Sequence, residues 1–375
     1  MATVDPAALY EELTDQGRRR RRLDELLYAA AERVPGIAPT AAEMEAERAL
    51  ALADKRGVEL AQGELAGRWL DEASTGAHLI DAMLAPLPES LERLEDFRRR
   101  GVAELGPVRV TRSGRAGLLE LRNPRYLNAE DGHTLGPTEV GVDLILLDDE
   151  IEVGVIRGGI VEHPRYAGER VFGAGINLTH LYQGRIDFLF YLLRDLGYVN
   201  KLFRGLRIEG GGTVEKLWVA VVERYAIGGA CQLLHVVDHV IAVRGARMHL
   251  PARREGIIPG ASNLRLPRFV GDRAARQAIL SGREWVAGEA DAAALCDEVV
   301  EAEGVEQALA DRIRALTDSG LVNAAANRAA LRVGAEPEET FRRYMATYAR
   351  EQARCHLSPA LVRNLERHWH ARQRV

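Results

Sequence analysis

Two short glycine-containing segments constrain the fold of this chain more than any other feature. They are residues 172–178 (FGAGINL) and 226–232 (AIGGACQ), which are well separated in the sequence. Small residues in each segment allow a sharp turn that leaves a backbone N–H uncovered. Two such amides facing one another form an oxyanion hole, which stabilises the enolate or the tetrahedral oxyanion of a thioester. We therefore expect a site built from backbone groups, since neither turn carries a side chain able to perform the chemistry alone.

The composition is that of an enzyme-sized globular protein. A chain of 375 residues can bury a sizeable core, and its length predicts one large domain with helical appendages, or two domains. Lys+Arg of 50 against Asp+Glu of 55 gives a net charge of -5, which argues against a nucleic-acid partner. The basic run at 18–22 is flanked by acidic residues, and we interpret it as a solvated helix face.

Cysteine spacing and hydropathy predict a cytoplasmic protein. Cys231, Cys296 and Cys355 are widely spaced and fit no metal or disulfide framework, which is typical of a reducing compartment. The N-terminus lacks the apolar segment of a signal peptide, and no apolar run approaches the ~20 residues that span a bilayer. We expect neither secretion nor a membrane partner.

Hydrophobic periodicity divides the chain into three regions, which we predict as domains. Residues 1–105 are predicted to be helical, residues 106–297 to alternate strands with helices, and residues 298–375 to be helical again. The alternation predicts an α/β layer architecture with sites at the strand-to-helix turns. The N-terminal helices are expected to cover the central region or build an oligomer contact, and the C-terminal helices to support oligomerisation. Individual predictions include helices over 40–60, 186–206 and 228–237, and strands over 108–111, 116–121, 151–157, 216–222 and 239–243.

Five sequence matches in a consistent order carry a family resemblance. They are 121–129 (LRNPRYLNA), 172–176 (FGAGI), 226–232 (AIGGACQ), 256–261 (GIIPGA) and 278–283 (AILSGR). Through them the chain from about residue 108 to 330 resembles the crotonase (enoyl-CoA hydratase/isomerase) superfamily. The resemblance implies an α/β spiral of ββα units with residues 106–297 as the catalytic core, CoA thioester substrates, and homotrimers or hexamers formed from two trimers.

The resemblance also assigns residues to the oxyanion hole. Carried over to this chain, the two amides are those of Ile176 and Gly229. A Gly-Gly pair alone could merely let a helix pack closely on a strand, but the presence of the partner turn favours the hole. Hydratases of the superfamily have two catalytic glutamates at the positions that Gln232 and Ala252 occupy here. Glu255 lies three residues from the second position and would need another backbone path, so hydratase chemistry, which requires positioned proton donors and acceptors, is disfavoured.

A narrower resemblance favours oxidation over hydration. Segments 175–182, 226–233 and 251–260, with the helical N-terminal extension, are similar to the cofactor-independent dioxygenases of glycopeptide-antibiotic biosynthesis. This implies that O2 oxidises (3,5-dihydroxyphenyl)acetyl-CoA through an enolate to (3,5-dihydroxyphenyl)glyoxylate and free CoA, on the way to dihydroxyphenylglycine. It implies no metal and no flavin, and no HExxH or dinucleotide-binding motif stands out in the sequence.

The resemblance further implies a small dry pocket for O2 beside the enolate, lined by Leu178, Ala252 and Ile257. Ala252 takes the place of a missing glutamate, whereas Leu178 and Ile257 could equally be ordinary core residues. His180 and Tyr182, just after the first turn, could supply a base and a phenol, but we expect them to serve packing.

Three polar residues are candidates to hydrogen-bond the two ring hydroxyls: Glu130, Arg194 and Gln232. A polar site of this kind discriminates strongly against an analogue without the hydroxyls. Glu130 could instead be a charge at a helix N-terminus, and Arg194 a surface ion-pair partner of Asp195 or Asp187.

Two other function classes stay open beside the dioxygenase. One is another crotonase-fold reaction, such as isomerisation or thioester hydrolysis. The other is a non-catalytic acyl-CoA-binding or scaffold protein, which the two intact turns disfavour. None of the candidate residues is singled out as the base that removes the Cα proton.

Overall fold

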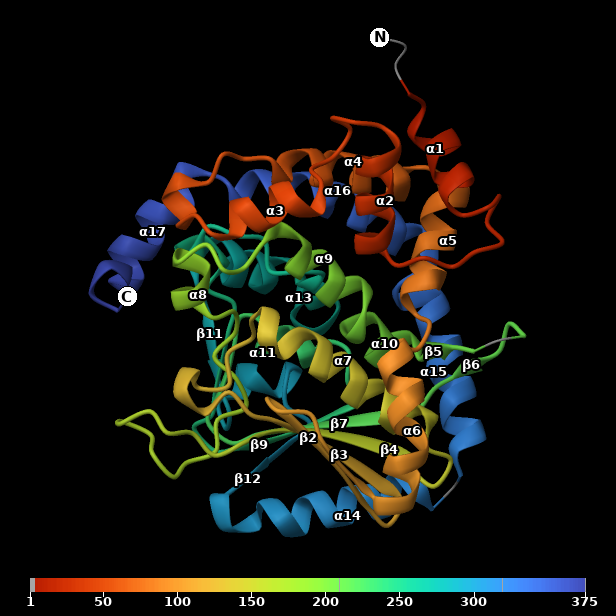
Figure 1. Cartoon of the computed structure of the whole chain (residues 1–375). Coiled ribbons are helices and arrows are strands. Elements are labelled where there is room, and N and C mark those ends of the chain that lie inside the picture. The colour runs from red at the N-terminus through yellow and green to blue at the C-terminus, as the bar shows by residue number, and fades with distance from the viewer. Residues whose placement is uncertain (1–3, 209, 319, 375) are drawn as a thin grey trace.

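The computed structural model describes residues 4–208, 210–318 and 320–374. Its largest element is a seven-stranded sheet in the order β1-β2-β3-β4-β7-β9-β12 (Figure 1). The first three strands pair antiparallel and the remaining pairs are parallel. The strands are β1 (Val102–Glu104), β2 (Val108–Ser113), β3 (Ala116–Leu121), β4 (Val153–Gly158), β7 (Leu217–Val222), β9 (His239–Val243) and β12 (Glu298–Val300).

The two central parallel strands are buried on both faces. β4 is buried along its whole length and β7 along all but its first residue, as expected for strands of a covered parallel sheet. Helix α7 (Gly132–Leu147) packs on one face of the sheet and α14 (Val305–Thr317) on the other (Figure 1). The strands predicted at 216–222 and 239–243 are confirmed, because their apolar runs suit this double burial.

A second, three-stranded sheet has the order β11-β10-β8, and a two-stranded sheet pairs β5 with β6. Their bounds are β5 (Leu206–Arg207), β6 (Thr213–Val214), β8 (Tyr225–Ile227), β10 (Arg247–His249) and β11 (Glu284–Val286). β10 runs parallel to β8 and antiparallel to β11. This small sheet places the segment just after β8, which contains the second glycine turn, beside the segment that follows β10.

Helices of varied length connect these sheets on the side that carries the glycine turns. They are α8 (Leu178–Tyr182), α9 (Phe188–Leu196), α10 (Tyr198–Arg204), α11 (Gly229–Leu233), α12 (Ala252–Glu255) and α13 (Ser262–Ser281).

Two helix predictions in this region are wrong in extent. The helix expected over 186–206 is divided at Gly197, whose φ of -85° and ψ of -116° are not helical. A Cβ at Gly197 would lie 2.8 Å from Glu139 Oε2, so close packing on α7 decides the break. The helix expected over 228–237 ends at Leu233, because the backbone N–H groups of the next three residues donate to carbonyls three positions earlier and the chain continues in tighter turns toward β9.

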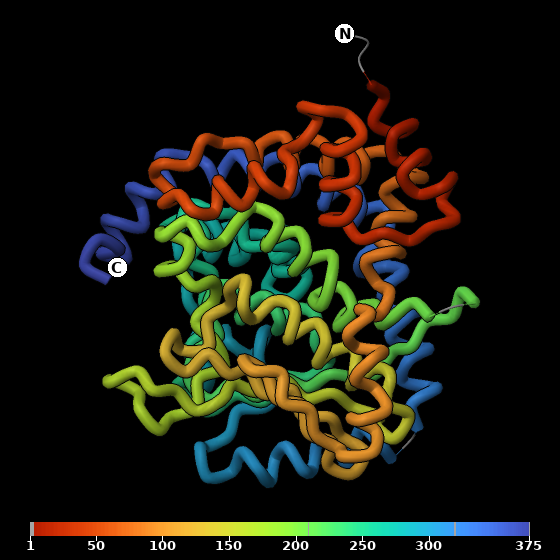
Figure 2. Tube along the Cα trace, viewed as in Figure 1, coloured from red at the N-terminus to blue at the C-terminus, as the bar shows by residue number. Residues whose placement is uncertain are grey.

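Helices from both ends of the sequence form one helical layer above these elements (Figures 1 and 2). They are α1 (Pro6–Leu13), α2 (Leu23–Arg33), α3 (Ala41–Arg48), α4 (Glu59–Asp71), α5 (Ala73–Met83), α16 (Glu338–His356) and α17 (Pro359–Trp369). Two further helices lie below this layer at the side of the sheet: α6 (Pro88–Arg100) packs against α7, and α15 (Leu321–Ala335) contacts β7 (Figure 1). α4 and α16 lie side by side although they come from opposite ends of the sequence (Figure 2). A Cβ at Gly63 of α4 would lie 2.5 Å from the Ala353 Cβ, so glycine permits this close approach.

The single helix predicted over 40–60 is wrong. α3 ends at Arg48, a short 3-10 turn spans Leu52–Asp54, and α4 begins at Glu59. The interruption has a tertiary cause: the Leu50 carbonyl packs directly against Gly184, where a Cβ would collide with it.

The helical layer is joined to the central region by buried polar contacts. Glu59 accepts a hydrogen bond from the Phe188 backbone at the start of α9, and Arg22 forms an ion pair with Glu139 of α7 at 2.9 Å. The layer therefore covers the elements that carry the first glycine turn. Within the described ranges, no helix has both the length and the apolar character needed to cross a bilayer.

Candidate active site

The two glycine turns lie against one another. Gly173 N donates to Tyr225 O, and Ile227 N donates to Gly173 O, both at 3.0 Å. Gly175 adopts a φ of 80°, and a Cβ there would lie 2.8 Å from the Ile227 carbonyl oxygen. Only glycine combines this left-handed conformation with so close an approach. The sequence therefore encodes the contact that brings the two turns together.

Two amides at this contact are free to bind a ligand. The neighbouring amides are used within the protein: Asn177 N donates to Glu130 O at 2.7 Å, and Gly228 N donates to His249 O at 2.8 Å. Among the described residues, by contrast, none accepts a hydrogen bond from the N–H of Ile176 or Gly229. These are the two amides that the sequence assigns to an oxyanion hole, and they have the unused donors that such a hole requires.

Both residues line a cavity of about 410 Å³, counted with its opening to solvent. We call it the main cavity. All of the predicted site residues except Leu178 line this cavity: Glu130, Ile176, Arg194, Gly229, Gln232, Ala252 and Ile257. Leu178 is the first residue of α8 and packs against the apolar core of the helical layer.

Arg194 organises the polar side of the main cavity. Its side chain is buried and donates to Glu130 Oε2 at 2.9 Å, to Gln232 Oε1 at 2.8 Å and to the Gly229 carbonyl oxygen at 2.7 Å. Burial opposes the charge of Arg194, but Glu130, Tyr198 and Asp195 nearby raise its pKa above the ordinary value. The alternative of an ion pair with Asp195 is confirmed in its partner, at 3.3 Å, but wrong in its surface location, because Arg194 is only 3% exposed.

Glu130 also lies directly against the second glycine turn. A Cβ at position 229 would collide with Glu130 Oε2, so the second turn needs glycine for side-chain space as well as for its amide. Glu130 precedes Asp131, the residue that caps α7, and its carboxylate is held by Arg194 and by the Tyr198 hydroxyl. These contacts place Glu130 at the cavity and not on the first turn of the helix.

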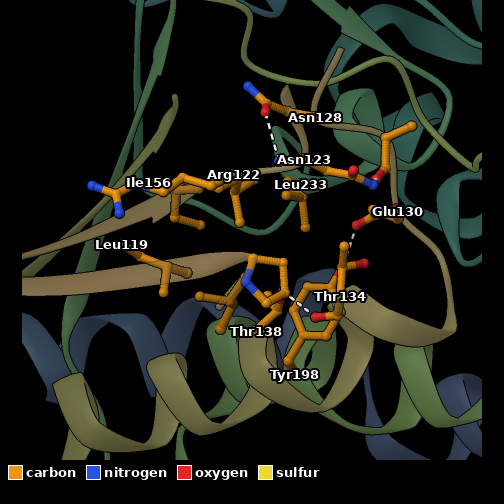
Figure 3. A pocket seen from close by; sticks show the side chains of 14 residues that line it. Leu119, Arg122, Asn123, Asn128, Glu130, Thr134, Thr138, Ile156, Tyr198 and Leu233 are labelled. Atoms are coloured by element: carbon orange, nitrogen blue, oxygen red, sulfur yellow. Dashed lines mark hydrogen bonds between the residues drawn. The ribbon is translucent and has the colours of Figure 1, made fainter. Parts of the chain in front are cut away.

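Behind Glu130 lies a second, inner cavity whose walls combine apolar and polar side chains (Figure 3). Leu119 and Ile156 of the sheet line it together with Tyr198. Glu130 lines both cavities, and its hydrogen bond from Tyr198 lies at their boundary (Figure 3). No local sequence pattern indicates this second cavity, because it exists only where α7, α10 and the sheet meet.

The opposite wall of the main cavity is formed by α12. Ala252 and Glu255 are its first and last residues, and a spacing of three residues places both on one helix face. Glu255 is buried, and burial raises the pKa of its carboxyl from 4.5 to about 7. The expectation that Glu255 needs another backbone path is therefore wrong, because one helical turn is sufficient to bring it into the cavity.

The two side chains just after the first turn do not line the main cavity. His180 is paired with Asp131 at 3.0 Å and stacks edge-on against Tyr126. The Tyr182 hydroxyl donates to Glu366 at 2.9 Å. Their contacts are those of packing residues, as expected from the sequence. In the part of the chain that the structure describes, no cluster of His, Cys, Asp and Glu side chains is arranged to hold a metal ion.

Comparison with known proteins agrees with this geometry. Residues 166–354 match the enoyl-CoA hydratase/isomerase family. Solved structures of enoyl-CoA hydratases share the fold: that from Mycobacterium avium subsp. paratuberculosis K-10 has a TM-score of 0.58 at 20% identity, covering 72% of this chain and 97% of the other. The chain belongs to the enoyl-CoA hydratase/isomerase family, and the crotonase resemblance is confirmed.

Among individual relatives, the (3,5-dihydroxyphenyl)acetyl-CoA 1,2-dioxygenase of Amycolatopsis orientalis is 46% identical over 349 residues. That match covers 92% of this chain and 80% of the relative. A probable enoyl-CoA hydratase of Rhizobium meliloti (strain 1021) is 31% identical over 192 residues, which is 51% of this chain and 67% of the relative. Similarity to the dioxygenase thus extends into the helical regions, whereas similarity to the hydratase spans about half of the chain.

Proposed function

We propose that this chain is a dioxygenase that uses O2 to convert (3,5-dihydroxyphenyl)acetyl-CoA to (3,5-dihydroxyphenyl)glyoxylate and free CoA. The observation that carries the proposal is one cavity with two unused amides in which Gln232 and Ala252 stand where hydratases have glutamates. Near-full-length similarity to a dioxygenase of this substrate supports it.

The amides of Ile176 and Gly229 would bind the thioester oxygen. The substrate's Cα–H lies between a thioester and an aryl ring, so two donors on the oxygen make the enolate accessible. Addition of O2 to the enolate carbon gives a peroxide, which closes on the thioester carbon and expels CoA. Breaking the O–O bond with loss of the second Cα hydrogen gives the keto acid. Substrate plus O2 equals glyoxylate plus CoA, so the atoms balance without another oxidant.

The ring would occupy the polar side of the main cavity. Glu130, Arg194 and Gln232 already form a connected hydrogen-bond network there, which can accept from and donate to the two ring hydroxyls. A buried network of this kind is left unsatisfied by a ring without hydroxyls, and so it discriminates strongly. Phenylacetyl-CoA should accordingly be a poor substrate.

The apolar wall would hold O2 beside the enolate. Ala252 and Ile257 line the main cavity there, and Leu178 would support this wall from the first turn of α8. We propose that no metal or organic cofactor takes part, since the enolate itself supplies the electrons that reduce O2.

The decisive experiment follows O2 with an electrode and free CoA with a thiol reagent, using protein freed of metals by a chelator. The expected result is equal consumption of O2 and release of CoA from (3,5-dihydroxyphenyl)acetyl-CoA. Thiol release without O2 uptake would identify a thioesterase instead. If neither changed while the thioester still bound, the protein would be a non-catalytic acyl-CoA-binding protein.

We also propose a cytoplasmic homotrimer, or a hexamer of two trimers, with the acyl-CoA thioester and O2 as its small-molecule partners. The proposal rests on family membership and on three free cysteines, of which Cys231 and Cys296 are buried. Light scattering coupled to size-exclusion chromatography would distinguish trimer from hexamer, and a monomer would contradict both.

A further inference from the structure

Glu255 differs from the other carboxylates that line the main cavity. Glu130 and Asp195 both accept hydrogen bonds from Arg194, at 2.9 and 3.3 Å. No described residue forms a hydrogen bond or an ion pair with the Glu255 carboxylate, although the residue is only 8% exposed. A buried carboxyl without a partner is costly, so such a group is retained where it has a task.

Among the described residues, no cation pairs with Glu255, since Arg194, which lines the same cavity, pairs with Glu130 and Asp195. Tyr191 of α9 and Tyr348 of α16 line the cavity with it, and burial raises the pKa of both phenols well above the ordinary value, so they stay neutral. α13 and α17 pack against α12, but no charged group on either helix shifts the pKa of Glu255, which responds to burial alone. Arg253 of α12 points outward, where it donates to the Leu280 carbonyl.

The position of Glu255 also favours a catalytic role. Glu255 lies one helical turn from Ala252 and lines the same cavity as the free amides of Ile176 and Gly229. A substrate whose thioester oxygen is bound by those amides has its Cα inside that cavity. We propose that Glu255 is the catalytic base that removes the Cα proton of the bound arylacetyl-CoA. This inference rests on the proposed function.

The step balances as follows. The Cα–H bond breaks, its electron pair forms the enolate held by the two amides, and the proton goes to a Glu255 carboxylate oxygen. When the peroxide closes on the thioester carbon, CoA leaves as thiolate and takes this proton from Glu255. The carboxylate is thereby regenerated. A pKa of about 7 suits the task, because general bases work best when their pKa lies near the operating pH.

The test measures proton removal apart from oxidation. Wild-type protein, Glu255→Gln and the surface control Glu303→Gln are incubated without O2 in D2O with (3,5-dihydroxyphenyl)acetyl-CoA, and deuterium at Cα is followed by mass spectrometry. We expect Glu255→Gln to slow exchange by about 100-fold or more, the usual contribution of a positioned base, with thioester binding retained. Glu303→Gln should exchange like wild type, and Glu255→Asp should recover part of the rate. Wild-type exchange should rise with pH through about 7, and exchange by Glu255→Gln should not.

The outcomes separate this inference from the proposed function. If Glu255→Gln is folded and exchanges or consumes O2 at the wild-type rate, Glu255 is not the base, while the dioxygenase stands. If wild type exchanges Cα hydrogen through Glu255 but consumes no O2, the dioxygenase fails and the base stands. Absence of both exchange and O2 uptake in wild type would overturn both.

Discussion

The main cavity has two walls that each carry a glutamate, and the contacts of the two glutamates differ. On one wall, which we call the α9 wall because Arg194 of α9 organises it, the partly buried Glu130 is bound by Arg194 and Tyr198. On the α12 wall, Glu255 has no partner among the described residues, and its pKa rises to about 7. Glu255 therefore shows the effect of burial on a carboxyl that no counter-charge reaches. One wall is suited to bind and orient, and the other to transfer a proton.

Adding a charge to the α12 wall should have the largest effect. Ala252→Glu places a second carboxylate one helical turn from Glu255, in the space proposed for O2. We expect O2 uptake to be abolished while thioester binding is largely retained, as measured by an oxygen electrode and by titration calorimetry. Ala252→Ser is the matched control and should keep most activity. Unchanged turnover of Ala252→Glu would refute the pocket.

Replacing Arg194 would leave Glu130 of the α9 wall without a cation, as Glu255 is on the α12 wall. Arg194→Leu removes the cation that binds Glu130 and leaves the buried Asp195 carboxylate without this partner, which typically costs about 3 to 5 kcal/mol of stability. Urea unfolding should report this loss. Arg194→Lys keeps the charge and should lose less. Equal stability of wild type and Arg194→Leu would show that the network is not held by charge.

The backbone between the walls can be tested without altering either glutamate. Gly229→Pro removes the amide, and loss of one oxyanion donor costs about 3 to 4 kcal/mol, a 100- to 1,000-fold fall in kcat. Gly229→Ala is the necessary comparison, because its Cβ makes the same collision with Glu130 but keeps the N–H. A folded Gly229→Pro variant as active as Gly229→Ala would rule out the oxyanion role.

The smallest expected effect is the pH dependence of stability contributed by Glu255. The pKa of Glu255 is about 7 in the folded protein, whereas its ordinary value is 4.5. Between these two pH values the folded chain therefore retains a proton that the unfolded chain has released. The free energy of unfolding should therefore fall as pH rises from about 4.5 to 7, by on the order of 3 kcal/mol in total.

Comparing wild type with Glu255→Gln over this pH range isolates that contribution, since all other groups are shared. The variant should be more stable than wild type at pH 8 and similar at pH 4. A difference independent of pH would mean that Glu255 is ionised in the folded protein across the range.

The sequence alone determined the features that depend on local backbone chemistry. The glycines at 173, 175, 228 and 229 predict turns with free amides, and the apolar runs at 217–222 and 239–243 predict buried strands. Gln232 and Ala252 occupy the positions where hydratases have two catalytic glutamates, and this difference could be read directly from the sequence. Each of these features depends on the residue type at its own position, so it can be predicted without knowing which segments pack around it.

The tertiary structure decided what depends on neighbours distant in the chain. It placed Glu130, Arg194 and Gln232 in one network, broke the helix expected over 40–60 at the contact between Leu50 and Gly184, and coiled α12 so that Glu255 enters the cavity. No local pattern encodes such contacts, because each is chosen by the packing of several segments at once. The free amides were determined by the sequence, and the carboxylate that faces them was decided by the fold.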